Sequence, residues 1–242
     1  MGTLYIVSTP IGNLEDITIR AIKTLVSSDA ILCEDTRRTG FLLSEIVKRY
    51  GEQFDADPEW KPKLIPYYDE IEEKQLPHII GLLESGKTLA LVSDAGTPLV
   101  SDPGFRGVRE CRKRGIPVVS IPGPSALLTA LTSSGLPADK FLFLGYPPEK
   151  QSARLSLFAS ILSSIDTSKY LPTVIFYCAP HKLTQTLEDM KTTFGDIEIT
   201  LARELTKMHE EFIRGTPYEV LEKLKEKPSI KGEFVVLISF KS

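Results

Sequence analysis

Residues 88–104, TLALVSDAGTPLVSDPG, decide the fold, because an apolar run passes directly into glycine, proline and small polar residues. Thr88–Ser93 is predicted to form a buried strand, and the turn-forming residues after it predict a loop at its carboxyl end. Glycine lets a ligand approach the backbone, while proline stiffens the loop. Ligands of open α/β sheets bind at such strand ends, so this loop is a candidate binding site.

Three further segments have the same character: Ser8–Thr18 (STPIGNLEDIT), Cys33–Gly40 (CEDTRRTG) and Ile121–Ala126 (IPGPSA). Each of them follows a predicted strand, and each alone is compatible with ordinary turn chemistry. Four such loops at successive strand ends are more than turns require. They predict one ligand site assembled from several loops.

The rest of the chain alternates strand and helix patterns. Strands are predicted at Leu4–Ser8, Ala30–Cys33, Leu64–Tyr67, Thr88–Ser93, Pro117–Ile121, Phe141–Leu144, Thr173–Tyr177, Glu198–Ala202 and Phe234–Phe240. Helical spacing of apolar residues begins near positions 17, 76, 183 and 220. This alternation predicts an α/β fold with parallel sheet and helices on its faces. The Pro-rich polar stretch Gly145–Ser152 indicates two domains, placed at 1–118 and 119–242.

Composition excludes several classes of protein. The 242 residues are 42% apolar and 25% charged, as in soluble globular proteins, and the net charge of −3 gives no general nucleic-acid footprint. Any RNA site is therefore a local patch. The cysteines Cys33, Cys111 and Cys178 form no CxxC pair, and His78, His181 and His209 lack metal-ligand spacing. With no secretion signal and no membrane-length apolar run, we expect a metal-free cytoplasmic protein.

One motif match is rejected. Residues 81–88, GLLESGKT, fit the phosphate-loop pattern GxxxxGK[ST], which requires a strand before the loop and a helix after it. Here a helical pattern precedes the motif and an apolar strand follows it. The segment is therefore interpreted as a helix-to-strand turn with Gly86 at the helix end. The dinucleotide fingerprint GxGxxG is absent from the chain.

The chain resembles the bacterial 16S ribosomal RNA (cytidine-2′-O)-methyltransferase family of the tetrapyrrole-methylase superfamily. The resemblance lies in LYIVSTPIGNLEDIT, EDTRRTG, LVSDAGTPLVSDPG and IPGPSA, and later in FYCAPHKL, LARELTK, EEFIRGT and KGEFVVLI. It spans nearly the whole chain. It implies a two-domain tetrapyrrole-methylase-like α/β fold with a cofactor cleft between the domains, S-adenosylmethionine as cofactor, a homodimer, and 16S ribosomal RNA or the small ribosomal subunit as partner.

The resemblance also implies the cofactor residues: Asp94, Gly96, Thr97, Pro98, Leu99, Ser125, Ala126, Tyr177, Cys178, Ala202 and Arg203. Thr97 stands where the superfamily loop Gly-Asp-Pro has aspartate, with Asp94 close by. Cys178 stands where relatives often carry glutamate, so no acid role is expected there. Ser125 is equally suited to cap the helix that follows it. For the second-domain residues Tyr177, Cys178, Ala202 and Arg203, a purely structural role at a strand end or a helix start is as adequate an interpretation as cofactor contact.

Methyl transfer to a ribose hydroxyl needs positioning and a proton acceptor. The candidate catalytic residues are Glu34, Asp35, Glu204 and Lys207, and the sequence does not choose among them. Asn13, Arg37 and Arg38 are predicted to contact RNA, although Arg37 and Arg38 are also placed to pair with Glu34 or Asp35. The basic run from Arg106 to Arg114 is compatible with RNA contact or with a solvated helix face. A small-molecule methyltransferase and a non-catalytic ribosome-assembly factor are the rival functions.

Overall fold

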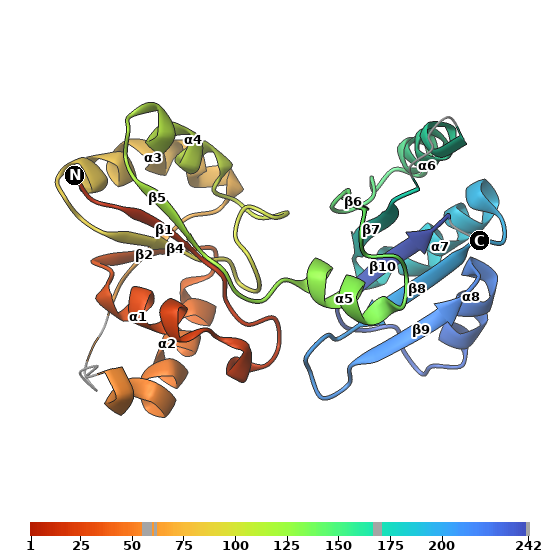
Figure 1. Ribbon diagram of the computed structural model, residues 1–242, viewed down its shortest axis with the longest axis horizontal. Coiled ribbons are helices and arrows are strands. Elements are labelled where there is room, and N and C mark those ends of the chain that lie inside the picture. The colour runs from red at the N-terminus through yellow and green to blue at the C-terminus, as the bar shows by residue number, and fades with distance from the viewer. Residues whose placement is uncertain (55–59, 61, 167–170, 241–242) are drawn as a thin grey trace. The chain divides into compact units, whose positions relative to one another are not determined.

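The computed structural model describes residues 1–54, 60, 62–166 and 171–240, which divide into two compact units, Met1–Ser125 and Ala126–Ser242. The boundary expected after residue 118 falls at the start of a strand that pairs with the first strand of the chain, so the structure places the division after Ser125. The Pro-rich stretch 145–152 lies within the second unit and connects a strand to a helix. Figure 1 shows the elements of each unit.

Unit 1 is built on a five-stranded sheet in the order β3-β2-β4-β1-β5. Its strands are β1 (Leu4–Val7), β2 (Ala30–Cys33), β3 (Lys63–Pro66), β4 (Leu89–Leu91) and β5 (Val118–Ile121), and all of their pairings are parallel. Each lies within a residue or two of its predicted position. The inner strands β2 and β4 are buried on both faces, which explains why they are continuous apolar runs, whereas the edge strands β3 and β5 carry exposed residues.

Helices cover both faces of this sheet (Figure 1). On one face, α1 (Ile19–Ser27) and α2 (Thr36–Tyr50) share a core with strand side chains such as Val7 and Ile31. On the other, α3 (Asp69–Glu84) and α4 (Phe105–Lys113) pack on the alternate strand side chains. Two short 3₁₀ helices, η1 (Leu14–Asp16) and η2 (Gly51–Phe54), complete the described part. The predicted parallel α/β architecture is confirmed for this unit.

The phosphate-loop match at residues 81–88 is a helix-to-strand turn, as predicted. α3 ends at Glu84, Gly86 adopts a left-handed φ of 92°, and β4 begins at Leu89. Lys87 forms an ion pair with Asp29, with its Nζ 2.8 Å from Oδ1. No helix begins after the glycine, so the segment lacks the helix N-terminus that binds phosphate in true phosphate loops.

Unit 2 also contains a five-stranded sheet, in the order β6-β7-β10-β8-β9. The strands are β6 (Phe141–Phe143), β7 (Thr173–Cys178), β8 (Glu198–Arg203), β9 (Glu211–Gly215) and β10 (Phe234–Ser239). Only β6 and β7 pair in parallel; β10 runs antiparallel to β7 and β8, and β9 antiparallel to β8. The expectation of parallel sheet is therefore wrong for this unit, because β8 and β9 are joined by a loop without a crossover helix.

The helices of unit 2 are distributed unevenly over the sheet. α6 (Gln151–Asp166), α7 (Pro180–Phe194) and α8 (Pro217–Lys225) share one core with one face of the sheet. α5 (Ala126–Ser134) contacts β8 and β10, and the Thr200 hydroxyl donates to the Ser134 carbonyl at 3.4 Å. A buried ion pair between Arg154 and Asp189 joins α6 to α7. Within the described ranges, no helix is long and apolar enough to cross a membrane.

Candidate functional site

The four strand-end segments that the sequence singles out meet at one edge of unit 1. They follow β1, β2, β4 and β5, which are neighbours in the sheet order β2-β4-β1-β5. Because all of these strands are parallel, their carboxyl ends lie at the same edge. The prediction that several strand-end segments form one cluster is therefore confirmed for this unit.

Hydrogen bonds join three of these loops directly. Thr9 and Gly96 exchange backbone hydrogen bonds of 2.8 and 3.0 Å. The Thr97 hydroxyl lies 3.0 Å from the Ser8 hydroxyl and donates to the Pro124 carbonyl, also at 3.0 Å. Thr97, the predicted replacement for a superfamily aspartate, thus connects the loops after β1, β4 and β5.

The loop after β4 holds an unusual backbone. Leu99 and Ser101 are non-glycine residues with φ of 72° and 67°, and Gly96 has φ of 86°. The hydrogen bonds of this loop engage Gly96 and Val100, whereas the backbone N–H groups of Thr97 and Leu99 donate to no group in the described ranges. Left-handed non-glycine residues concentrate at ligand sites, and free N–H groups can bind a ligand. Gly96–Leu99 therefore fits a cofactor that is recognised by main-chain groups.

A group of acidic side chains lies beside this loop. Glu34 follows β2, and its Oε1 accepts the backbone N–H of Asp94 at 3.1 Å. Asp94 in turn accepts the backbone N–H of Asp35 on Oδ1 at 3.2 Å and Arg38 Nη1 on Oδ2 at 3.0 Å. These bonds fasten the loop after β2 to the loop after β4. The predicted residues Glu34, Asp35, Asp94 and Arg38 are thus brought together.

The environment of Glu34 favours its neutral form. Burial, together with the nearby charge of Asp102, raises the pKa of Glu34 to about 7. Burial, together with the charges of Asp94 and Asp69, raises the pKa of Asp102 to about 6. Asp102 was not predicted as a site residue, because its electrostatic effect on Glu34 depends on β2 and β4 being neighbours. A carboxyl group that titrates near neutral pH is suited to accept a proton.

The predicted RNA contacts lie around the start of α2 and in the loop after β1. Asp35 is the N-cap of α2 and also binds Arg37, with Arg37 Nη2 2.9 Å from Oδ2. The hydrogen bonds from Arg37 hold the pKa of Asp35 well below its usual range. The side chains of Arg37 and Arg38 stay 90% and 68% exposed despite their acidic partners. Asn13 is exposed and caps η1 by accepting the N–H of Glu15.

Phe41 is a further exposed residue of α2 that was not predicted. Its side chain is 70% exposed and lies about one helical turn after Arg37 and Arg38. An aromatic ring beside cations is a recurrent arrangement in RNA-binding surfaces. The signal in the sequence was present, since Phe41 interrupts an otherwise polar face of α2.

The predicted cofactor residues of unit 2 separate onto two faces of its sheet. Tyr177 and Ala202 both pair with Val235 of β10, and side-chain alternation places all three on the face that α5 covers. Cys178 points to the opposite face, where it is 3% exposed in the core. Burial raises the pKa of the Cys178 thiol to about 11. Any ligand contact by Cys178 would therefore use its backbone.

The junction of the two units carries Ser125 and Ala126. Ser125 directly precedes α5, and Ala126 is the first residue of that helix. Both are partly buried. This position is compatible with the predicted second cofactor loop and with a helix cap, the two interpretations that the sequence left open.

Glu204 and Lys207 occupy the loop between β8 and β9, and each has a partner. Lys207 Nζ lies 3.0 Å from Glu204 Oε1 and 3.1 Å from Glu233 Oε2. Burial acts to raise the pKa of Glu204, but the hydrogen bonds from Lys207 and from the Glu233 backbone outweigh it and hold this pKa below its usual value. Arg203 binds the Lys231 carbonyl and Glu211. Glu204 and Lys207 form a structural ion-pair network, which was not predicted.

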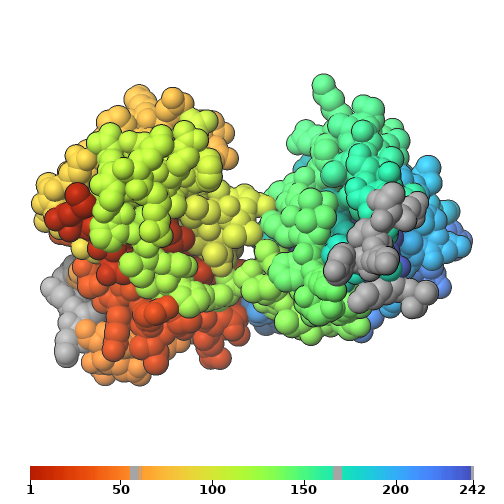
Figure 2. Space-filling view, turned by 45° about the horizontal axis from the view of Figure 1, so that its top comes forward, coloured from red at the N-terminus to blue at the C-terminus, as the bar shows by residue number. Residues whose placement is uncertain are grey.

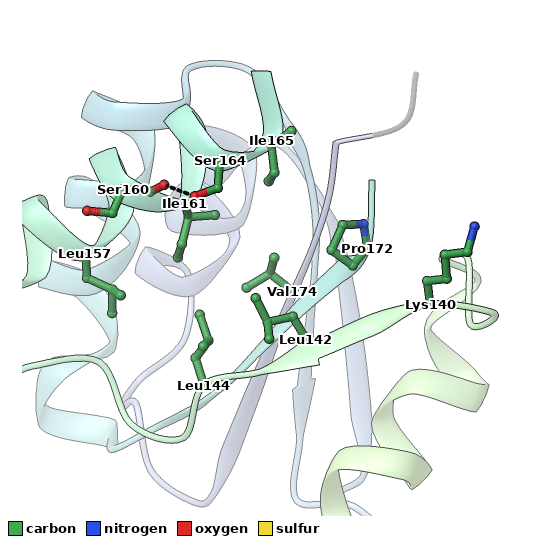
Figure 3. Close-up of a pocket in the computed structure, with 10 residues that line it drawn as sticks. All are labelled: Lys140, Leu142, Leu144, Leu157, Ser160, Ile161, Ser164, Ile165, Pro172 and Val174. Carbon is green, nitrogen blue, oxygen red and sulfur yellow. Dashed lines mark hydrogen bonds between the residues drawn. The ribbon is translucent and has the colours of Figure 1, made fainter. Parts of the chain in front are cut away.

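An apolar cavity of about 390 Å³ lies elsewhere in unit 2, between β6, β7 and α6 (Figure 3). Leu142, Leu144 and Val174 face Leu157 and Ile161 across it. None of the predicted site residues lines it. Among the described residues, no group of three or more histidine, cysteine, aspartate or glutamate side chains is arranged to hold a metal ion.

Comparison with known proteins decides the family. The family model of tetrapyrrole (corrin/porphyrin) methylases matches residues 3–221. This chain belongs to the tetrapyrrole methylase family. It is 47% identical over 236 residues to the ribosomal RNA small subunit methyltransferase I of Hydrogenobaculum sp. (strain Y04AAS1), covering 98% of this chain and 95% of the relative. The protein of the same name from Thermotoga maritima is 42% identical over 241 residues, the full length of both chains.

Solved structures of other proteins share the fold of this chain. A diphthine synthase aligns with a TM-score of 0.68 at 16% identity, covering 98% of this chain and 90% of the other. A uroporphyrin-III C-methyltransferase from Thermus thermophilus, complexed with S-adenosylhomocysteine, aligns with a TM-score of 0.58 at 17% identity, covering 98% and 97%. This likeness confirms the predicted fold class of the tetrapyrrole methylase family.

Proposed function

We propose that this protein is an S-adenosylmethionine-dependent methyltransferase that methylates the ribose 2′-hydroxyl of a cytidine in the decoding centre of 16S ribosomal RNA. Membership of the methylase family and 42–47% identity to small-subunit RNA methyltransferases support it. The observation that carries the proposal is the cluster of four strand-end loops, with free main-chain donors beside a carboxyl group that titrates near pH 7. The partner is 16S ribosomal RNA or the assembled small subunit, and the reaction takes place in the cytoplasm.

The cofactor is assigned to the loop after β4 and its neighbours. Gly96, Thr97, Pro98 and Leu99 offer main-chain groups, with Asp94 next to them, and S-adenosylmethionine supplies a methyl group on a sulfonium that is a good leaving group. The other residues proposed to contact the cofactor are Ser125, the last residue of unit 1, and, in unit 2, Ala126, Tyr177, Ala202, Arg203 and the backbone of Cys178. Fixing the reactants in position supplies much of the rate in such a displacement.

Glu34 is assigned as the proton acceptor. A ribose hydroxyl loses its proton as its oxygen takes up the methyl group, so a base within hydrogen-bond reach lowers the barrier. Glu34 combines partial burial with a pKa of about 7, which gives a substantial fraction of carboxylate at neutral pH. Asp35 and Asp94 are committed to capping α2, to Arg37 and Arg38, and to backbone N–H groups. Glu204 and Lys207 are committed to each other and to Glu233.

The exposed start of α2 is assigned to the RNA. Arg37 and Arg38 can exchange their exposed carboxylate partners for phosphates at little cost, because exposed ion pairs contribute about 1 kcal/mol or less. Phe41 is placed to stack on a base or ribose near those phosphates. Asn13, in the loop after β1 at the same edge of the sheet, is proposed to add a polar contact. A homodimer is also part of the proposal, since two copies would present a wider surface to a large RNA.

The test is methyl transfer to purified small ribosomal subunits from cells that lack the protein. With labelled S-adenosylmethionine, we expect label in 16S RNA and one new 2′-O-methylated cytidine when the RNA is mapped. Label in a porphyrin-type substrate but not in RNA would support the small-molecule alternative and overturn the proposal. Binding to subunits without any methyl transfer would support an assembly factor instead. Light scattering at micromolar concentration tests the dimer, which a monomer mass would contradict.

A further inference from the structure

The basic side chains of α4 and of Arg114, the residue that caps its C-terminus, form two sets. Three of them have carboxylate partners: Arg106 Nη1 lies 2.6 Å from Glu73 Oε2, Arg114 binds Glu84 and Glu110, and Lys113 Nζ lies 3.7 Å from Glu110 Oε2. Arg109 and Arg112 are exposed, and no ion pair joins either of them to a carboxylate in the described part of the chain. Within this one basic segment, the charges of Arg109 and Arg112 are therefore the two that no carboxylate of the described residues pairs with.

The two unpaired arginines share a helix face with an exposed aromatic ring. Phe105, Arg109 and Arg112 have the spacing i, i+4, i+7, which places them on one face of a helix. The Phe105 side chain is 63% exposed, and the Arg109 guanidinium lies 5.9 Å from the centre of its ring. We call these three residues the α4 stripe. α4 lies at the surface of unit 1, where it is coloured lime in Figure 2.

A buried carboxylate fixes the helix that carries the α4 stripe. Glu72 is 4% exposed, and its Oε1 accepts the backbone N–H groups of Arg106 at 3.0 Å and Gly107 at 3.2 Å. It also accepts the Tyr67 hydroxyl at 2.9 Å. A Cβ on Gly107 would lie 2.5 Å from that hydroxyl oxygen, so the helix packs closely on the end of β3. The stripe is therefore held on a rigid element, which lowers the entropic cost of binding.

We propose that the α4 stripe is a second contact surface for the ribosomal RNA, in addition to the start of α2. Phosphates supply the negative charge that Arg109 and Arg112 lack, and a base or ribose packs on the Phe105 ring or the Arg109 guanidinium. α2 and α4 lie on opposite faces of the sheet, and both begin after strands that end at the loop cluster. RNA contacting both helices would thus be held on either side of the proposed site. The inference rests on the proposed function, since it assigns a surface to the same substrate.

The experiment compares two variants that each remove two positive charges from one helix. Arg109→Ala/Arg112→Ala removes the unpaired cations, and Arg106→Ala/Arg114→Ala removes paired ones. Methyl transfer to small subunits is measured over a range of subunit concentrations, and subunit binding over a salt series. For Arg109→Ala/Arg112→Ala we expect a KM for subunits raised about tenfold and a log–log salt slope reduced by about 1.4 for two single-stranded phosphate contacts. The kcat and the affinity for S-adenosylmethionine are expected to remain within twofold.

The control variant distinguishes a specific RNA contact of Arg109 and Arg112 from a general effect of lost positive charge. Arg106→Ala/Arg114→Ala should keep a wild-type salt slope, because removing these side chains removes no phosphate contact. Equal slopes for the two variants, or a wild-type KM for Arg109→Ala/Arg112→Ala, would overturn the inference. A change of oligomeric state in Arg109→Ala/Arg112→Ala would also overturn it, since the stripe would then be an interface between copies. If the wild-type protein transfers no methyl group to subunits, the proposed function fails first, which separates the two outcomes.

Discussion

Two loops of this protein carry similar residues in opposite electrostatic settings. At the edge of unit 1, Glu34 lies partly buried among other carboxyl groups, and its pKa is raised to about 7. In unit 2, Glu204 lies between Lys207 and the Glu233 backbone, and its pKa is lowered. Both loop regions contain left-handed non-glycine residues, Leu99 in the first and Glu204 in the second. The difference shows that residue type and backbone strain alone do not identify a proton acceptor.

Sheet topology explains the contrast. In unit 1 the strands are parallel, so acidic residues from separate loops converge on one edge and repel one another. In unit 2 an antiparallel pair places Glu204 beside the loop before β10, where Lys207 neutralises it. The first arrangement leaves a carboxyl group that can take up a proton, while the second uses its carboxylate for structure. This comparison supports the proposal that Glu34, rather than Glu204, is the proton acceptor.

The largest effect is expected for Glu34→Gln, which tests the contrast between Glu34 and Glu204. Glu34→Gln keeps an acceptor for the Asp94 N–H but removes the base, so methyl transfer should fall by about 10²–10⁴-fold. Glu204→Gln should change kcat by less than about tenfold and mainly lower stability, because it breaks the ion pair with Lys207. Single-turnover methyl transfer with saturating subunits measures both. Cofactor affinity checks that each variant is folded. A larger loss of kcat in Glu204→Gln than in Glu34→Gln would reverse the assignment.

The site of unit 1 also shows which features could be predicted from the sequence and which could not. Three of the four loops of unit 1 were predictable because glycine and proline follow apolar strands closely, and the loop after β2 because the polar residues Glu34 and Asp35 follow its strand. The hydrogen bond of Glu34 with Asp94 and the electrostatic effect of Asp102 on Glu34 were not predictable, since both depend on β2 lying next to β4 although about 60 residues separate these strands in the chain. Asp102 was missed for that reason.

Unit 2 was less predictable, for physical reasons of its own. β9 was missed because it is an edge strand whose charged residues Glu211 and Arg214 obscure the alternation. α6 was not predicted either; its apolar and serine residues show little helical asymmetry. The parallel pairing predicted from the strand–helix alternation of the whole chain did not hold for β8 and β9, which are antiparallel and joined by a loop. Cys178 and Tyr177 are adjacent in sequence yet point to opposite faces of the sheet.

A second prediction concerns the exposed start of α2. Arg37→Ala/Arg38→Ala should reduce RNA affinity and lower the log–log salt slope by about 0.7–0.9 per lost contact, while cofactor affinity remains unchanged. If Arg37 and Arg38 only form ion pairs with Asp35 and Asp94 and do not contact RNA, the salt slope stays at the wild-type value. Stability would then fall by about 1 kcal/mol or less per exposed pair. Subunit binding across a salt series, with cofactor binding as the folding control, distinguishes the two.

The pH dependence sharpens the role of Glu34. A proton acceptor with a pKa of about 7 is mostly protonated at pH 6 and mostly ionised at pH 8, so kcat/KM should rise about tenfold across that interval. A raised carboxyl pKa has the opposite effect on stability: the folded state loses stability as pH rises from 4.5 through 7. Glu34→Gln should therefore flatten the kcat/KM profile of the residual activity and raise the melting temperature at pH 8. A wild-type profile that is flat between pH 6 and 8 would count against Glu34.

The position of Glu204 predicts that substitution of its neighbour Gly232 lowers stability. Gly232 has φ of 110°, and a Cβ there would lie 2.7 Å from Glu204 Oε1. Gly232→Ala should lower the free energy of unfolding by about 1–3 kcal/mol, because it adds a clash to a strained backbone. Gly195→Ala is the matched control: φ is 69°, and nothing lies within 4 Å of the added Cβ. Its cost should be about 1 kcal/mol. Equal costs in denaturant titration would show that Glu204 yields to the added Cβ.

The smallest expected effect is at Cys178, and it tests the two faces of the unit 2 sheet. Because the thiol is buried in the core, Cys178→Ala should cost about 1 kcal/mol of stability and leave affinity for S-adenosylmethionine within twofold. Tyr177→Ala changes the opposite face, where the ring contacts Phe143 and Tyr146 with centroids 4.8 and 5.6 Å apart. It should weaken cofactor binding more strongly if Tyr177 belongs to the cofactor site. Calorimetric titration of both variants compares them directly. A loss of affinity in Cys178→Ala equal to that in Tyr177→Ala would mean that packing of β7, rather than the face a side chain occupies, controls binding.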